Sequence, residues 1–142
     1  MKYRDVLQGR QWMGRLNKDA DLLESFTEMA RVNQVRLGWI TDIGALTRAR
    51  LSAYDQKTRK YVEFELDGPL EILNLTGNIS MKDGEIFCHI HATLAREDGC
   101  TIGGHVCEGC SIFALEFHVK ELTGESFLRL PDEDTGLSLW NL

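Results

Sequence analysis

Proline is nearly absent from the 142-residue chain, which contains two, and no low-complexity segment, linker or internal repeat occurs. These absences argue against a disordered or linker-rich protein. The length is that of one domain, because a single hydrophobic core still gains efficiently from added residues in this size range. We therefore predict one compact domain that covers residues 1–142.

Long apolar runs are also missing. No stretch approaches the roughly 20 apolar residues that are needed to span a bilayer, and the N-terminus lacks the basic and then apolar layout of a signal peptide. The sequence therefore predicts no membrane association and a cytoplasmic location.

Positive charge is scarce. The chain has 16 basic and 22 acidic residues, a net charge of -6, so its overall field repels polyanions. Acidic residues interleave the basic residues that come nearest to a cluster, which are Arg48, Arg50, Lys57, Arg59 and Lys60. This balance argues against simple nucleic-acid binding, and it leaves open a basic patch formed only in the fold or in an oligomer.

Helical spacing occurs near the N-terminus. Asp19 is a suitable N-cap, and Asn33 marks the end of the pattern. Between them, apolar residues recur at the period of a helix and face acidic residues: Leu22, Leu23, Phe26, Met29 and Ala30. The spacing predicts a helix over 19–33.

Period-2 alternation follows the helix and predicts antiparallel strands. In its clearest stretch Val62, Phe64 and Leu66 alternate with glutamates, and Gly68-Pro69 is expected to break the run. Further strands are expected at about 39–54, 70–80, 85–95, 101–107 and 110–120. An antiparallel sheet covered by one main helix is an α+β fold. The apolar tail around Trp140 is expected to dock on this body or on a neighbouring subunit.

The strand expected over 85–95 carries two histidines, His89 and His91. Residues 86, 88, 90, 92 and 94 are apolar or cysteine and predict a core-facing side, so the histidines share the other side. Side chains at i and i+2 stand about 6 to 7 Å apart at the backbone, close enough for two imidazole nitrogens to reach one ion. Alone, this pair is about equally compatible with a metal half-site and with two histidines that bind nothing.

A third histidine strengthens the metal interpretation. His105 follows Gly103 and Gly104, after a turn centred on Asp98-Gly99 that can fold the next strand back and place His105 at nearly the height of His91. The two glycines would permit a close backbone approach. Three neutral imidazoles with one open position are the ligand set of a catalytic-type zinc site.

His118 is not expected to supply a fourth ligand. It lies on the polar side of a strand whose other side is expected in the core, so a surface histidine is the preferred interpretation. The residues expected to be buried on that strand are Phe113, Leu115, Phe117 and Val119.

The chain has four cysteines, Cys88, Cys100, Cys107 and Cys110, and free thiols or metal ligands are expected rather than disulfides. Cys107 and Cys110 form a C-x-x-C across two turn residues, which suits a β-hairpin better than a redox motif at the start of a helix. We interpret both mainly as structural thiols. Cys107 shares its strand side with His105 and remains a candidate soft ligand.

Glu71 stands in an otherwise apolar strand. A carboxylate in such a run needs an arginine or a metal-bound group as its partner, and a solvated sheet edge explains it equally well.

Several motifs together resemble the PPC (plants and prokaryotes conserved) domain family. They are Gly44-Ala45-Leu46, Glu71-Ile72-Leu73, Gly77-Asn78-Ile79-Ser80, His89-Ile90-His91, Gly103-Gly104-His105 and Arg129-Leu130-Pro131-Asp132. The resemblance extends over nearly the whole chain, and the order and spacing of these motifs are more specific than any one of them.

The resemblance implies a compact α+β domain that assembles as a homotrimer, with a metal, usually zinc, on His89, His91 and His105. It also implies a predicted DNA-binding or regulatory role, because plant relatives join this domain to an AT-hook that enters the minor groove. This sequence has no Arg-Gly-Arg-Pro-like AT-hook and is net acidic, so DNA binding is expected to be weak.

Three functions follow from these observations. A metal-binding trimeric module ranks first, a DNA-binding regulator second, and a metal-dependent hydrolase or lyase that uses metal-bound water third. The third function needs a general acid and a substrate pocket, and neither is evident from the sequence.

Overall fold

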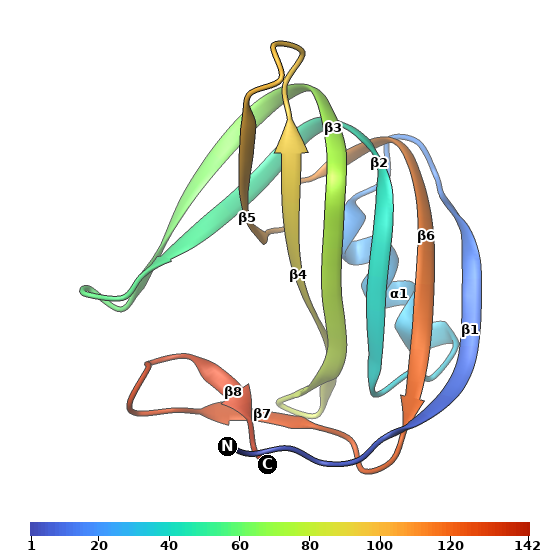
Figure 1. The fold of residues 1–142 in the computed structure, drawn as a ribbon, viewed down its shortest axis with the longest axis vertical. Coiled ribbons are helices and arrows are strands. Elements are labelled where there is room, and N and C mark those ends of the chain that lie inside the picture. Colours follow the sequence, from blue (N-terminus) through green and yellow to red (C-terminus); the bar gives the residue numbers. More distant parts are fainter.

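The computed structural model describes residues 1–142 and contains one helix packed on a large β-sheet. The helix, α1, spans Leu22–Val32. The strands are β1 (Leu7–Leu16), β2 (Gly38–Asp55), β3 (Lys60–Lys82), β4 (Glu85–Ala95), β5 (Thr101–Val106), β6 (Ser111–Thr123), β7 (Leu128–Pro131) and β8 (Ser138–Trp140). All strand pairs are antiparallel except β3 and β7, which confirms the predicted mainly antiparallel sheet with one helix (Figure 1). This helix is too short to cross a membrane.

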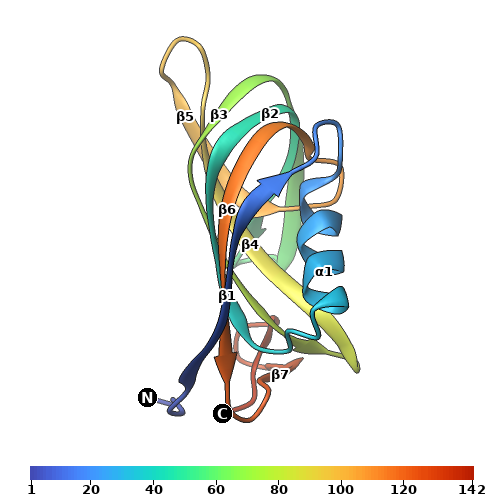
Figure 2. The same ribbon diagram turned by 90° about the vertical axis from the view of Figure 1, so that its right-hand side faces the viewer.

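The sheet curls because four of its strands, β2 to β5, pair in a closed circuit. β2 pairs with β3 along one edge, and with β6 and then β5, end to end, along the other. Since β4 joins β3 to β5, strands β2, β3, β4 and β5 form a closed circuit of pairings. α1 lies on one side of the curved sheet and buries its apolar stripe there (Figure 2).

The N-cap of α1 lies two residues later than predicted. Its N-cap is Asp21, whose carboxylate accepts a hydrogen bond from the Glu24 amide at 2.9 Å. Asp19 has a positive φ of 64°, and its amide donates to the Ile112 carbonyl, so the chain first pairs with β6. The end of the helix at Asn33 is confirmed.

Gly68-Pro69 does not break the strand that contains it. β3 continues through this dipeptide, and the register with β2 shifts between Leu46 and Arg48. Proline lacks an amide donor, and an irregularity of this kind is one of the few strand positions where that loss is tolerated. The two strands predicted from the alternation are therefore one strand of 23 residues.

Phe113 is 55% exposed, so its predicted burial was wrong. The pairing of β6 with β2 shifts register between Ala45 and Leu46, and this irregularity lets Ile112 and Leu115 both reach the core. Leu115 and Val119 are buried as predicted, and Phe117 packs against the core.

The tail docks on the body of the same chain, one of the two predicted outcomes. β7 extends the sheet beside the end of β3, with Leu128 opposite Met81, and β8 folds back on β7. Phe127 and Trp140 pack edge to face with ring centroids 5.0 Å apart. This C-terminal hairpin lies below the β2–β3 hairpin tip in Figure 1.

One carboxylate, Asp42, lies on the core side of β2 without a partner. Its register partners are Leu75 and Phe117, its side chain is 6% exposed, and neither oxygen accepts a hydrogen bond. Burial raises the pKa of Asp42 to about 7. The hollow beside it is also lined by the charged or titratable Arg15, Glu116 and His118.

We expect Asp42→Asn to stabilise the protein at pH 8 and to have little effect at pH 4. The raised pKa means that the contribution of Asp42 to stability is greatest below the unfolded value near 4 and falls as the pH rises toward 7. A neutral asparagine avoids this loss, which is on the order of 4 kcal/mol for about three pKa units. Urea unfolding at both pH values, with the exposed Asp67→Asn as control, measures the difference. Equal effects of Asp42→Asn at pH 4 and pH 8 would contradict the assignment.

Candidate metal centre

His89 and His91 share one side of β4, as predicted from the alternation. The residues between and around them, Cys88, Ile90 and Ala92, are buried in the core. β5 runs antiparallel beside β4 and places His105 directly opposite His91 in the register, which confirms the predicted hairpin. The three imidazoles therefore meet on the side of the sheet that faces away from the core.

The three rings lie close enough to act together. Their centroids are separated by 4.9 Å for His89 and His91, 5.0 Å for His89 and His105, and 5.5 Å for His91 and His105. One ring nitrogen of each lies within 4.8 Å of those of the other two, so the group could hold a metal ion. His105 Nδ1 is buried and has no hydrogen-bond partner, which fits a nitrogen directed at an ion.

Burial favours the neutral form of His89 and His105. Burial first, and the nearby Arg129 second, lower the pKa of His89 to about 4. The pKa of His105 is also lowered by burial and then by His91 and Arg129. Neutral imidazole is the form that ligates metals, so His89 and His105 are ready to do so at neutral pH.

The β4–β5 hairpin depends on glycine where backbones come close. A Cβ on Gly103 would stand 2.7 Å from the Ala92 carbonyl oxygen, and one on Gly104 would stand 2.9 Å from that of Ser52. β5 fits between β4 and β2 because neither residue has a side chain. The close backbone approach that these glycines were predicted to permit is therefore one between strands of the same chain.

Arg129 is a site residue that the sequence interpretation missed. It comes from β7, is 7% exposed, and donates from Nη2 toward Nδ1 of His89 at 3.3 Å. The sequence signal was a basic residue inside the apolar strand Leu128–Pro131, within a motif already noted for the family resemblance. Its distance along the chain from the histidines hid its role.

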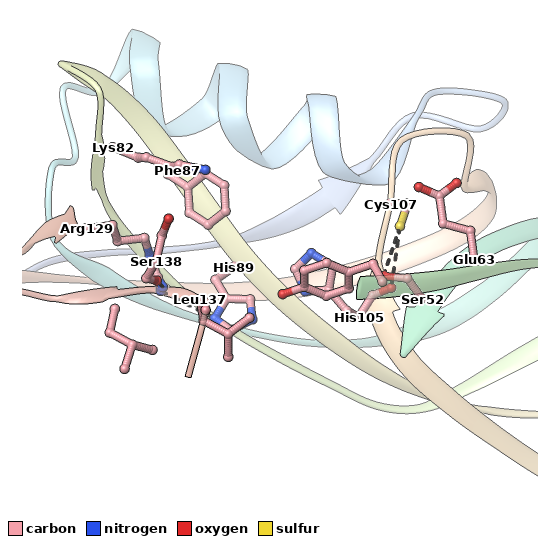
Figure 3. Close-up of a pocket in the computed structure, with 13 residues that line it drawn as sticks. Ser52, Glu63, Lys82, Phe87, His89, His105, Cys107, Arg129, Leu137 and Ser138 are labelled. Carbon is pink, nitrogen blue, oxygen red and sulfur yellow. Dashed lines mark hydrogen bonds between the residues drawn. The ribbon is translucent and has the colours of Figure 1, made fainter. Parts of the chain in front are cut away.

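A cavity of about 390 Å³ opens beside the histidines. His89 and His105 form part of its wall, Arg129 and Lys82 approach from the side of the C-terminal hairpin, and Cys107 lies at the far end (Figure 3). A substrate-sized pocket thus exists next to the candidate metal centre.

None of the other candidate ligands joins the group of three histidines. His118 on β6 pairs its Nε2 with the Gln11 side-chain oxygen at 2.8 Å, so it is no fourth ligand, as predicted. Cys107 lines the cavity but contacts Ser52 Oγ at 3.4 Å. Glu71 is exposed, forms no ion pair with an arginine and does not belong to the histidine group, which favours the solvated-edge interpretation.

The C-x-x-C segment does not form a β-hairpin, contrary to the prediction. β5 and β6 do not pair with each other, and both follow the same edge of β2. The Cys107 amide donates to the Arg50 carbonyl, and the buried Cys110 thiol contacts the Arg50 backbone. Burial raises the pKa of Cys110 to about 11. Cys110 is therefore a structural thiol, as predicted.

Comparison with known proteins identifies relatives over most of the chain. The family model of the Plants and Prokaryotes Conserved (PCC) domain matches residues 3–123. Bifunctional protein GlmU from a Synechococcus strain is 34% identical over 124 residues, which are 86% of this chain. The chain spans about a fifth, 19%, of the length of that curated relative.

Solved structures show the same fold. A metal-containing protein from Archaeoglobus fulgidus is 41% identical, with 99% of each chain covered and a TM-score of 0.94. A plant- and prokaryote-conserved (PPC) protein from Pyrococcus horikoshii is 31% identical, with 100% of this chain and 98% of that chain covered and a TM-score of 0.93. A proposed DNA-binding protein from Bacteroides thetaiotaomicron shares the fold at 24% identity, with 96% of each chain covered and a TM-score of 0.85.

Proposed function

Since the chain belongs to the Plants and Prokaryotes Conserved (PCC) domain family, we propose that it is a metal-binding, trimeric module of that family. His89, His91 and His105 hold one ion in this proposal. The observation that carries it is the convergence of the three ring nitrogens within 4.8 Å of one another. The metal-containing relative from Archaeoglobus fulgidus supports the same reading.

Zinc is the metal that we propose. Three neutral imidazoles and one open position match its common tetrahedral coordination. Nickel, copper and iron also accept imidazole, so the ligands alone do not select the ion. Elemental analysis of purified protein tests the proposal, and we expect close to one zinc per chain. A metal-free protein that also fails to take up added zinc or cobalt would contradict it.

A metal-dependent hydrolase or lyase is not favoured. A metal held by three imidazoles can lower the pKa of a bound water to near 7, but the reaction still needs a general acid or base. Glu63 is the one carboxylate among the residues that line the cavity, and it forms an ion pair with Arg50. No other carboxylate is available there for proton transfer.

The trimer in this proposal is supported by three exposed apolar side chains on the side of the sheet opposite α1. Met13, Trp39 and Ile43 are 85%, 43% and 59% exposed. Their register partners on β6 are His118, Lys120 and Glu116, and the pairs alternate with core residues such as Ile40. Trp39 also lines a small hollow with His89 and His91, so this surface adjoins the metal centre. A closed trimer would bury this surface in every subunit, so that no copy of it stays exposed to recruit further chains.

DNA binding is a second candidate because of the family relatives, and we expect it to be weak in this chain. The net charge of -6 opposes phosphate contacts. The arginines nearest to a basic cluster are also engaged internally. Arg48 donates to the Gly109 carbonyl, Arg50 pairs with Glu63, and Arg59 donates to the carbonyls of residues 133 and 134.

Fluorescence anisotropy with duplex DNA across a salt series measures this expectation. Non-specific affinity should be no tighter than about 10⁻⁴ to 10⁻⁶ M at physiological salt. Tight binding that is abolished by the combined change of Arg48, Arg50 and Arg59 to alanine would show that a local basic patch overrides the net charge.

A further inference from the structure

Arg129 is a buried cation without an opposite charge. Its four hydrogen-bond partners are neutral: Ser80 Oγ at 2.9 Å, the Ser138 carbonyl at 3.0 Å, Asn78 Oδ1 at 2.9 Å and His89 Nδ1 at 3.3 Å. Its guanidinium carbon also lies 5.1 Å from the Phe87 ring centroid and 5.7 Å from that of Trp140. No carboxylate lies within ion-pair distance. A buried charge without a counter-charge is costly, so its retention calls for an explanation.

The cavity beside Arg129 is electropositive. Lys82 lines it, with its ammonium 5.4 Å from the centroid of the Phe87 ring. Glu63 supplies the one acidic side chain in the wall, and Arg50 already neutralises it. Figure 3 shows Arg129 and Lys82 on the same side of the cavity as His89. An ion on the three histidines would add further positive charge, so the cavity favours an anion.

Metal binding at His89 would release a donor of Arg129. An imidazole that ligates a metal through Nε2 carries its proton on Nδ1, and one that ligates through Nδ1 has no free lone pair there. In both cases Nδ1 stops accepting from Arg129 Nη2. The guanidinium has five N–H groups, and in the metal-loaded protein two of them would lack a protein acceptor.

We propose that this cavity binds a small organic oxyanion, a carboxylate or a phosphate ester, whose charged end lies between Arg129 and the metal on the three histidines. The guanidinium fork matches both head groups. The body of the ligand would lie against Phe87, Leu137 and Leu139, while Tyr61 offers a hydroxyl group. The proposal rests on the proposed metal-binding function for the position of the anion.

Cobalt-loaded protein tests the proposal, because the visible spectrum of Co²⁺ reports both its ligation by histidine and any ligand that joins it. Benzoate, phenyl phosphate and the uncharged benzamide are the probes, since they share a ring and differ in the head group. We expect benzoate or phenyl phosphate to change the spectrum saturably with a Kd below about 1 mM. Benzamide should bind at least about tenfold more weakly. Whichever of benzoate and phenyl phosphate binds more tightly shows whether the site prefers a carboxylate or a phosphate ester.

Three variants locate the anion. Arg129→Met should weaken anion binding at least about tenfold, and it should hold Co²⁺ at least as tightly as wild type because a nearby positive charge is removed. Lys82→Met should weaken anion binding a few-fold. Because Lys82 is only half-buried, this variant replaces Arg129→Met in the test if Arg129→Met does not fold. Arg96→Met, in the exposed β4–β5 turn, is the matched control and should bind the anion like wild type.

The outcomes separate the two proposals. Cobalt that binds but responds equally to benzoate and benzamide, or to neither, would overturn the anion site and leave the metal centre intact. Unchanged anion affinity in folded Arg129→Met would also overturn it. If cobalt does not bind, the proposed metal function fails. Calorimetry with benzoate on the metal-free protein then decides the anion site, which stands only if binding is seen and Arg129→Met or Lys82→Met weakens it.

Discussion

Replacing any one of His89, His91 or His105 with alanine is expected to remove most of the bound metal. The three ring nitrogens converge on one position, and no fourth histidine, cysteine or carboxylate joins the group to replace a lost ligand. Changes of residues that only support metal ligands cost about 10- to 100-fold in affinity. Loss of a ligand itself should therefore cost at least about 100-fold, or roughly 2.8 kcal/mol.

The measurement is metal content by elemental analysis after dialysis against a weak chelator. His118→Ala is the matched control, because His118 lies on β6 with Gln11 as its partner and should retain wild-type metal content. If His91→Ala keeps the same stoichiometry as wild type, the three histidines do not act as one site.

Ile43→Glu is expected to convert the proposed trimer into monomers. Ile43 lies on the exposed side of β2 between β3 and β6, in the apolar surface that the trimer would bury. A carboxylate there would face Glu116, its register partner on β6, and enclosing the two like charges would cost several kcal/mol in each of three equivalent contacts. Wild-type protein should show a mass three times the chain mass of 16.1 kDa, and the variant should show the chain mass itself.

Light scattering at micromolar concentration provides the masses. Val32→Glu is the control, because Val32 is 70% exposed at the end of α1, on the other side of the sheet, and its change should leave the mass unaltered. A wild-type mass of a single chain would refute the trimer.

The parts of the fold that could be predicted are those with strong periodicity. The apolar stripe of α1 and the alternation in β4 both reflect burial on one side, so they can be read without a structure. β1 was missed because it is an edge strand with no buried residue, and its alternation is correspondingly weak. The displaced N-cap depends on a hydrogen bond from Asp19 to β6, and the irregularity near Phe113 depends on the pairing of β6 with β2. Local sequence patterns do not encode either of these long-range pairings.

The candidate site also contains residues that could be predicted from local sequence and one residue that could not. His89, His91 and His105 could be grouped because one hairpin carries all three, and a turn with glycine fixes its register. Arg129 could not be grouped with them. Its position follows from the parallel pairing of β7 with the end of β3, a contact between segments far apart in the sequence.

The local β4–β5 hairpin and the distant C-terminal tail differ in how readily they open in the folded protein. His91 and His105 face each other across a short loop, whose closure costs little entropy. Arg129 lies 40 residues beyond His89 and reaches it through a short, two-stranded appendage. Such small peripheral units open most readily in native-state hydrogen exchange. Amides of the C-terminal hairpin should thus exchange faster than those of β4, so the pocket can open and close while the three imidazoles stay in place.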